Sequence, residues 1–383
     1  MNILFTAGGT GGHILPIVGV VREIRRTYSE REKLEFFYIG PKDEFGEIFL
    51  SHEGIEIKRV LAGKIRRYSN WKSIFQNLLD CLIKIPIGIL QAFFYIFVLS
   101  PDLIFSKGGF GSIPAVTAGW LLKTPILLHE SDVSPGLANR FLVKFARKIF
   151  VSFPKTEWFP PSKMILTGNP IRREILEGSS KSAQELFKLN GGKPVVLILG
   201  GSQGAQRIND KILEILSELL KDFEILHQCG EKNFKQVRAE AKVVISGDLE
   251  KYYHPVPFLK EEVLKHAYYV ADLILSRAGS GSLFEIAAMG KPSILVPLPE
   301  AAQNHQVKNA YAYAENGAAI VMEEANFTPR FFLEKLKELF SHPEELEKMA
   351  NRAKEFARPE AAKIVAGYIV NCLTPLEARQ SAR

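Results

Sequence analysis

Residues 1–13, Met-Asn-Ile-Leu-Phe-Thr-Ala-Gly-Gly-Thr-Gly-Gly-His, decide the fold class of this chain. The apolar run 3–5 predicts a buried strand that leads directly into a turn of four glycines. Glycine lets the backbone adopt positive φ or approach a ligand closely. A helix expected from about Ile14 would direct its free N–H groups at an anionic ligand. The stretch predicts a parallel α/β fold, although any α/β protein can open in this way.

The turn does not fit the dinucleotide fingerprint G-x-G-x-x-G. Counting from Gly9, the third glycine would have to stand at Ile14. The second apolar run, 36–39, ends in Gly40 and offers no carboxylate for a ribose. A nicotinamide-dependent enzyme is therefore excluded.

Length and composition indicate a two-domain globular protein. The chain has 383 residues, of which 46% are hydrophobic and 24% charged. Its three cysteines are too far apart for a disulfide framework or a zinc knuckle, and no signal peptide precedes the first strand, so we expect a reducing cytoplasm. The net charge of +7 favours an anionic partner: nucleic acid, nucleotide phosphate or an anionic membrane face.

The pattern of strand, polar or glycine turn and helix recurs in the first half. The run 103–105 precedes a second glycine turn at 106–112, and the run 126–128 precedes His129 and Glu130. Polar residues at the ends of parallel strands form the sites of such sheets, but these two could also cap and pair locally.

A second α/β half follows the proline-containing segment 153–170, which is typical of a domain boundary. The run 195–199 precedes a glycine turn, and so does the run 273–275. The turn 276–282 aligns with 106–112, because serine, a cation, two glycines and serine occupy matching positions. We therefore expect two similar Rossmann-like domains with parallel sheets that face each other across a cleft.

The segment 64–99 combines a basic cluster with a strongly apolar run. Its uninterrupted apolar part is too short to span a bilayer, which needs about 20 residues. One interpretation is a buried helix that covers the sheet and is kinked or divided by Pro86. The other is a surface that rests on an anionic membrane, and both can hold because a helix has two faces. The membrane candidates are Lys64, Arg66, Arg67, Trp71, Lys72 and Phe75, and the interruptions of the run are Asp80, Lys84, Pro86 and Gln91.

The glycine turns are suited to binding phosphate groups. The sequence contains no recognisable metal-binding motif, and no Walker lysine follows a glycine turn. Glu285, one turn along the helix after the turn 276–282, could accept both hydroxyls of a ribose. Arg277 and the helix N-terminus could neutralise a diphosphate. His13 would lie across the cleft from them. Together, Arg277, Glu285, His13 and the helix N-terminus are suited to a reaction in which a nucleoside diphosphate leaves without a metal ion.

Taken together, the motifs resemble those of the MurG family of peptidoglycan N-acetylglucosaminyltransferases. The resemblance implies the GT-B fold, no metal and no cofactor, with UDP-N-acetylglucosamine as the donor. It implies transfer of N-acetylglucosamine to the 4-hydroxyl of the muramoyl sugar of lipid I, which is linked to undecaprenyl diphosphate, so that lipid II and UDP are the products. The residues that carry it are Gly8–His13, Lys107–Ser112, His129–Asp132, Pro135–Asn139, Gly168–Arg172, Gly200–Ala205 and Arg277–Glu285.

The resemblance also implies domains and donor-binding residues. It predicts an acceptor- and membrane-facing domain at 1–162, a UDP-sugar domain at 163–355, and a C-terminal helix within 356–383 that packs back toward the first domain. Asp132 and Phe110 stand where family members often have Asn and Tyr, and neither receives a role. The implied donor-binding residues are Thr10, Gly11, Gly12, Asn139, Arg172, Ser202, Leu259, Arg277, Ser280, Gly281, Ser282, Glu285 and Gln306.

For the reaction we expect a direct displacement with inversion at the anomeric carbon. His13 is either the base or a binder of the acceptor diphosphate, because histidine titrates near neutrality. A lipid-linked acceptor places the protein on the cytoplasmic face of the membrane as a peripheral protein, with no nucleic acid partner. The rivals are a GT-B enzyme with another acceptor, a UDP-sugar epimerase and a catalytically silent binding protein.

Overall fold

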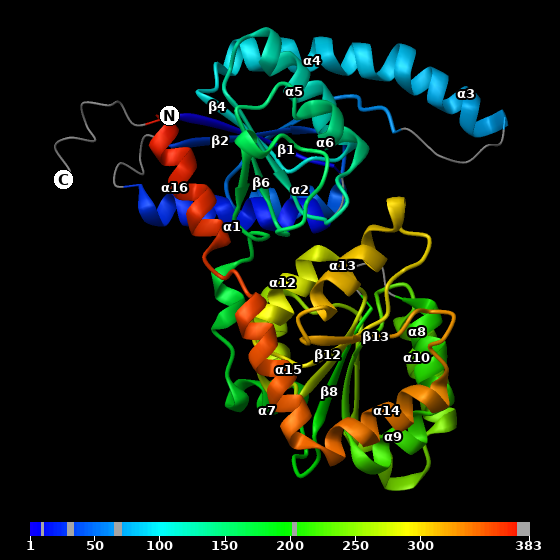
Figure 1. The fold of residues 1–383 in the computed structure, drawn as a ribbon. Coiled ribbons are helices and arrows are strands. Elements are labelled where there is room, and N and C mark those ends of the chain that lie inside the picture. The colour runs from blue at the N-terminus through cyan, green and yellow to red at the C-terminus, as the bar shows by residue number, and fades with distance from the viewer. Residues whose placement is uncertain (9–10, 29–33, 65–70, 201–204, 374–383) are drawn as a thin grey trace, which may run out of the picture. The chain divides into compact units, whose positions relative to one another are not determined.

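The computed structural model describes residues 1–8, 11–28, 34–64, 71–200 and 205–373. The chain divides into two compact units, Met1–Arg172 with the C-terminal segment from Pro359, and Arg173–Arg358. Figure 1 shows a sheet flanked by helices in each unit. The first unit extends ten residues beyond the predicted boundary at 162.

Within the described residues, the first unit contains a seven-stranded parallel sheet in the order β3-β2-β1-β4-β5-β6-β7. The boundary prediction was wrong because strand β7 pairs with β6, so the prolines between them lie in a loop of one sheet rather than in a linker. The strands are β1 (Asn2–Thr6), β2 (Glu35–Gly40), β3 (Glu56–Arg59), β4 (Leu103–Ser106), β5 (Ile126–Glu130), β6 (Lys148–Val151) and β7 (Met164–Leu166).

Helices cover both faces of this sheet because successive strand residues point to opposite sides. Ile3 and Phe5 pack with helices α1 and α16, whereas Leu4 packs with α4 and α5. Helix α1 starts at Gly11, three residues before the predicted start, so His13 lies in its first turn. The helices of this unit are α1 (Gly11–Thr27), α2 (Glu44–His52), α3 (Trp71–Leu79), α4 (Ile85–Leu99), α5 (Ile113–Leu121), α6 (Leu137–Leu142) and α16 (Ala361–Leu373).

The segment from α3 to α4 is one long helix. A π-helical stretch, Asp80–Lys84, joins α3 to α4, and the Ile85 N–H bonds to the Asp80 carbonyl. Pro86, the next residue, has no N–H to donate, and the π turn accommodates it. The helix is therefore not divided at Pro86, and of the two expected effects of this proline only a local irregularity remains, the π-helical stretch directly before it.

The apolar run is longer as a helix than its interruptions suggest. Phe75–Leu99 is long and apolar enough to cross a membrane by length and composition, with a mean hydropathy of 2.1 over its most apolar window. Only a narrow stripe of α4 (Gly88, Ala92 and Ile96) is buried. The expectation of a buried helix therefore holds for one face only.

In the second unit, the described residues form a six-stranded parallel sheet in the order β10-β9-β8-β11-β12-β13. Its strands are β8 (Val195–Leu199), β9 (Glu224–Gln228), β10 (Tyr253–Val256), β11 (Leu273–Ser276), β12 (Ser293–Leu295) and β13 (Ala319–Val321). Its helices are α7 (Ser180–Phe187), α8 (Gln206–Glu214), α9 (Leu216–Asp222), α10 (Phe234–Val244), α11 (Glu261–Val270), α12 (Ser280–Ala288), α13 (His305–Ala314), α14 (Pro329–Ser341) and α15 (Pro343–Phe356). The two sheets confirm the predicted α/β fold class.

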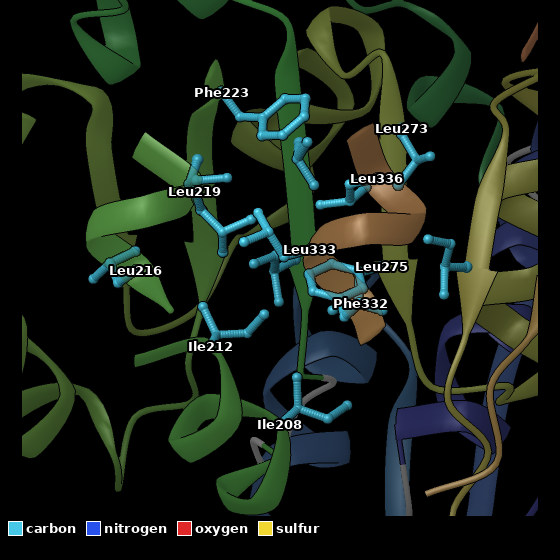
Figure 2. Packing of buried hydrophobic residues seen from close by; sticks show 14 of the residues in the cluster. Ile208, Ile212, Leu216, Leu219, Phe223, Leu273, Leu275, Phe332, Leu333 and Leu336 are labelled. Carbon is cyan, nitrogen blue, oxygen red and sulfur yellow. The ribbon is translucent and has the colours of Figure 1, made fainter. Parts of the chain in front are cut away.

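The core of the second unit also lies on both faces of its sheet. On one face, Leu273 and Leu275 of β11 pack with Ile212 of α8 and Phe332 of α14 (Figure 2). On the other face, Ile274 packs with α7, α11 and α12. The strand ends that carry polar residues are thus held between two apolar layers.

Candidate functional site

In the first unit, two glycine turns meet at the carboxyl ends of β1 and β4. The Gly8 N–H donates to the Gly108 carbonyl at 2.7 Å. Gly109 has φ of 81°, and a Cβ there would lie 2.8 Å from Gly8 Cα and 3.2 Å from His13 Nε2. Any side chain would therefore separate the turns, which explains the glycines. The contact also brings His13 to the edge of the second turn.

The end of β5 adds a buried carboxylate to this edge of the sheet. Glu130 accepts hydrogen bonds from the backbone N–H groups of Asp132 at 3.1 Å and Gly136 at 3.2 Å, and from Asn139 Nδ2 at 2.9 Å. Burial, and secondly the charge of Asp132, raise the pKa of Glu130 to about 7. Glu130 therefore caps the turn that follows β5, and its pKa near 7 leaves it able to exchange a proton near neutrality.

Asn139, a predicted donor-binding residue, is bonded within the first unit. Asn139 is 3% exposed, and its Nδ2 donates to Glu130 and to the His129 carbonyl. It also packs against the second glycine turn, because a Cβ on Gly108 would lie 2.5 Å from Asn139 Nδ2. Asn139 therefore holds the Glu130 turn in place, and its contact with the donor stays a prediction.

In the second unit, helix α12 starts at the carboxyl end of β11. Ser280, Gly281 and Ser282 form its first turn, where the backbone N–H groups have no partner within the helix. A Cβ on Gly279 or Gly281 would meet no protein atom within 4 Å, so these glycines leave open space at the helix N-terminus. This end of α12 is suited to an anion.

Glu285 lies one turn further along α12 and is 9% exposed. Tyr268 of α11 donates its hydroxyl to Glu285 Oε2 at 3.0 Å. The bond orients the carboxylate, and the sequence analysis did not identify Tyr268 because nothing near it in the chain points to Glu285. Glu285 is therefore an oriented acceptor and not a solvated helix charge.

Arg277 is held by protein partners beside helix α12. Its guanidinium pairs with Glu324 and donates to the Val296 carbonyl at 3.1 Å. Burial opposes the ionisation of Glu324, but hydrogen bonds from Arg207 and Arg277 outweigh it and hold the pKa of this carboxyl below its ordinary value. Arg277 thus ties the turn before α12 to the loop after β13, and its role at a diphosphate stays a prediction.

Two further predicted residues are fixed by neighbours. The side chain of Leu259 is 3% exposed within the core, and its N–H donates to Gln228 Oε1 at 3.1 Å. The backbone of Leu259 is thus fixed to the end of β9, and its contact with the donor stays a prediction. Gln228 ends β9 and could have been found by the rule that singled out His129. Gln306 accepts from the Leu298 N–H at 3.0 Å, which sets the orientation of its carboxamide.

The remaining predicted residues fall into three groups. Gly11 and Gly12 start α1, and Arg172 is 4% exposed at the end of the first unit. Lys64 Nζ lies 6.0 Å from the Phe110 ring centre, and Trp71 and Phe75 are exposed. Thr10, Ser202, Arg66 and Arg67 lie outside the described residues, as does the side chain of Lys72. The described residues contain no group of three or more potential His, Cys, Asp or Glu ligands for a metal ion.

Comparisons with known proteins extend over most of the chain. Residues 3–151 match the glycosyltransferase family 28 N-terminal domain, and residues 195–365 match the C-terminal domain of that family. A UDP-N-acetylglucosamine--N-acetylmuramyl-(pentapeptide) pyrophosphoryl-undecaprenol N-acetylglucosamine transferase of Clostridium tetani is 35% identical over 345 residues, which are 90% of this chain and 91% of the relative.

Solved structures agree with this assignment. The crystal structure of Acinetobacter baumannii MurG has a TM-score of 0.72 at 26% identity and covers 97% of this chain and 99% of its own. A UDP-GlcNAc 2-epimerase of Neisseria meningitidis has a TM-score of 0.66 at 17% identity, covers 97% of this chain and 100% of its own, and shares the fold alone. The matches of both domains show that the chain belongs to glycosyltransferase family 28, within its MurG group, and has the two-domain GT-B fold.

Proposed function

We propose that this chain transfers N-acetylglucosamine from UDP-N-acetylglucosamine to the 4-hydroxyl of the muramoyl sugar on undecaprenyl diphosphate, with inversion and without a metal ion. The donor and the acceptor are supported by relatives that match over 90% of the chain and are named for this transfer. Lipid II and UDP are the products.

The observation that carries the donor side is the Glu285 carboxylate oriented by Tyr268. A carboxylate with one oxygen held in place presents its remaining lone pairs to the two vicinal hydroxyls of a ribose. The first turn of α12 lies one helical turn away and would face the diphosphate. Both parts of a uridine diphosphate therefore find partners on one helix.

We further propose that the transfer needs no metal ion, because the N-terminus of α12 can stabilise the leaving diphosphate. The departing UDP gains negative charge in the transition state, and fixed N–H donors at a helix N-terminus can stabilise it. Within the described residues there is no carboxylate cluster that would hold a divalent cation on the diphosphate. We therefore expect full activity in EDTA.

His13 is the candidate group on the acceptor side. Its Nε2 lies beside the glycine turn, within the edge of the sheet that Glu130 completes. It acts either as the base that receives the proton of the attacking hydroxyl or as a partner of the acceptor diphosphate. The kinetics of the His13→Ala variant separate these roles. If His13 is the base, the variant should have a lower kcat. If His13 binds the acceptor diphosphate, the variant should have a higher KM for the acceptor.

A membrane surface is the proposed location, on the cytoplasmic face and as a peripheral protein. Leu90, Phe94 and Phe97 of the long helix are 70%, 63% and 67% exposed. The opposite stripe of α4 packs against α5, so lipid cannot surround the helix and it would lie along the surface. Trp120 of α5, the helix that packs against α4, is also 50% exposed. Such a surface brings the protein to a lipid-linked acceptor.

Vesicle sedimentation tests the location. Replacing Leu90 and Phe97 by Ser should abolish binding to vesicles of phosphatidylglycerol and phosphatidylcholine, and charge reversal at Arg66 and Arg67 should weaken it. Val243 of α10 is 85% exposed in the second unit, and Val243→Ser is the matched control that should leave binding unchanged. Unchanged partition of the Leu90 and Phe97 variant would overturn the proposed membrane surface.

Release of UDP from UDP-N-acetylglucosamine, with and without a lipid I analogue and in EDTA, tests the whole proposal. Release that needs the acceptor and survives EDTA supports a metal-free transferase. Activity restored only by Mg²⁺ would overturn metal independence and keep the transferase. Acceptor-independent conversion of the donor to UDP-N-acetylmannosamine would indicate an epimerase, and absence of UDP binding would indicate a silent protein.

A further inference from the structure

Lys107 is a buried charged residue that the proposed mechanism does not use. It follows β4 directly and is 1% exposed. Its Nζ lies 2.9 Å from His129 Nδ1 and also donates to Ser131 Oγ. A buried ammonium is costly unless partners replace its hydration, so these two acceptors are needed for its position.

The second nitrogen of His129 determines the proton arrangement. His129 Nε2 lies 3.1 Å from the Gly168 carbonyl, which can only accept, so Nε2 carries the hydrogen. Nδ1 is then the acceptor for Lys107. Burial, then the charge of Lys107 and that of His13, hold the pKa of His129 well below its ordinary value. His129 is therefore neutral and held as the Nε2–H tautomer.

This cluster is continuous with the candidate site. Asn139 Nδ2 donates to the His129 carbonyl at 3.0 Å and to Glu130 at 2.9 Å. Gly108, next to Lys107 in the chain, packs against Asn139 and precedes the glycine that contacts His13. Lys107 on one side and Asn139 on the other thus hold the turn that starts at His129 against the glycine turn.

We propose that Lys107 is a positioning residue for the transfer reaction: its buried ammonium donates to His129 Nδ1, keeps that imidazole neutral and holds the turn that starts at His129 against the glycine turn that contacts His13. This inference rests on the proposed function. Lys107 acts through its neighbours and does not touch the substrate, since its side chain is buried.

The charges around Lys107 make the effect depend on pH. Burial lowers the pKa of Lys107 to about 8, against the opposing charges of Glu130 and Asp132. The Lys107 cation in turn favours the ionised form of Glu130, whereas Asp132 opposes it. Removal of the cation therefore raises the pKa of both Glu130 and His129, so more protons are held near neutrality.

The test is the pH profile of kcat/KM for the acceptor in Lys107→Met, which replaces the ammonium by an apolar side chain of similar length. We expect the acidic limb of the profile to move to higher pH by about one unit. At a pH below this limb, kcat/KM should be about tenfold lower than in the wild type, and near pH 9 it should return to the wild-type value. Lys123→Met is the matched control, because it removes a lysine charge outside this cluster in the same unit, and its limb should not move. A loss of equal size at every pH would show a purely structural role and overturn the proposal.

A second readout does not depend on activity. In nitrogen-15 NMR of the full chain, with the signal assigned through His129→Gln, His129 of the wild type should be a neutral Nε2–H tautomer. In Lys107→Met its titration should move to higher pH, because the neighbouring cation is gone. An unchanged titration of His129 would contradict the proposal. If the wild-type protein releases no UDP with the lipid I analogue, the proposed function fails, and the NMR result still decides whether Lys107 controls His129.

Discussion

The pair of Tyr268 and Glu285 gives the sharpest prediction about donor binding. Glu285 Oε2 accepts the Tyr268 hydroxyl at 3.0 Å, and both side chains are buried. The remaining lone pairs of the carboxylate would accept two ribose hydroxyls, each bond contributing about 1.5 kcal/mol. The Glu285→Gln variant should therefore lose about 3 kcal/mol of UDP affinity, or about 150-fold in Kd.

Tyr268→Phe keeps the carboxylate and removes only the bond that orients it. We expect a smaller loss of about 1.4 kcal/mol, or about tenfold in Kd, because the carboxylate must then be ordered on binding. Calorimetric titration with UDP measures both variants. With 2′-deoxy-UDP, which lacks one hydroxyl, the penalty of Glu285→Gln should shrink by about half.

The chain offers a matched control for this experiment. Tyr311 of α13 donates to Glu323 at 2.7 Å but is 46% exposed, so Tyr311→Phe removes a Tyr–Glu hydrogen bond outside the proposed site. Its UDP affinity should equal that of the wild type. Wild-type affinity in both Glu285→Gln and Tyr268→Phe would refute the assignment of α12 as the ribose-binding helix.

Three further predictions concern packing and charge. Gly109→Ala should lower the free energy of unfolding by about 2 kcal/mol, because Gly109 has positive φ and lies close to Gly8. Gly367 of α16 is the control, because a Cβ there would meet nothing within 4 Å. Gly367→Ala should be neutral or stabilising in thermal unfolding. Arg277→Ala leaves the half-buried Glu324 with Arg207 as its remaining cation, so the midpoint of urea unfolding should fall by the equivalent of about 1 kcal/mol; an unchanged midpoint would contradict the pairing. The pKa of Glu130 is raised in the folded state from 4.5 to about 7. Its contribution to the free energy of unfolding is therefore complete below pH 4.5 and is lost as the pH rises through 7. Urea unfolding at several pH values should show this loss in the wild type and not in Glu130→Gln.

The strands and glycine turns could be predicted from the sequence, since buried parallel strands read as continuous apolar runs. The runs 3–5, 195–199 and 273–275 all lie in strands that hydrogen-bond to neighbours on both sides. The start of α1 was predicted three residues late, because Gly11 and Gly12 continue the turn in sequence but adopt helical conformation.

The long helix shows why interrupted apolar patterns are difficult to interpret. Asp80 accepts from the Lys64 N–H at 3.1 Å and pairs with Lys84 at 2.6 Å. Gln91 accepts from the Leu61 N–H at 2.8 Å. These polar residues fasten the segment 61–64 to the helix and do not divide it. The sequence cannot reveal this, because the partners are backbone groups up to 30 positions away.

The sequence indicates which residues gather at the strand ends, but it does not reveal their distant partners. Glu285 follows from its spacing after the glycine turn, whereas nothing near it in the chain points to Tyr268. The partner of Arg277, Glu324, lies on another loop with no local signal. In the same way, the fold and not the motif directs the Asn139 carboxamide to Glu130.

The most direct test of the central claim is the identity of the product. The purified chain is incubated with UDP-N-acetylglucosamine and a lipid I analogue in EDTA, and the acceptor is analysed by mass spectrometry and by NMR of the new linkage. The account predicts an acceptor heavier by one N-acetylhexosamine, joined by a β linkage to the muramoyl 4-hydroxyl, with one UDP released for each transfer. An α linkage, a sugar on another hydroxyl, or an unmodified acceptor beside converted donor would contradict it.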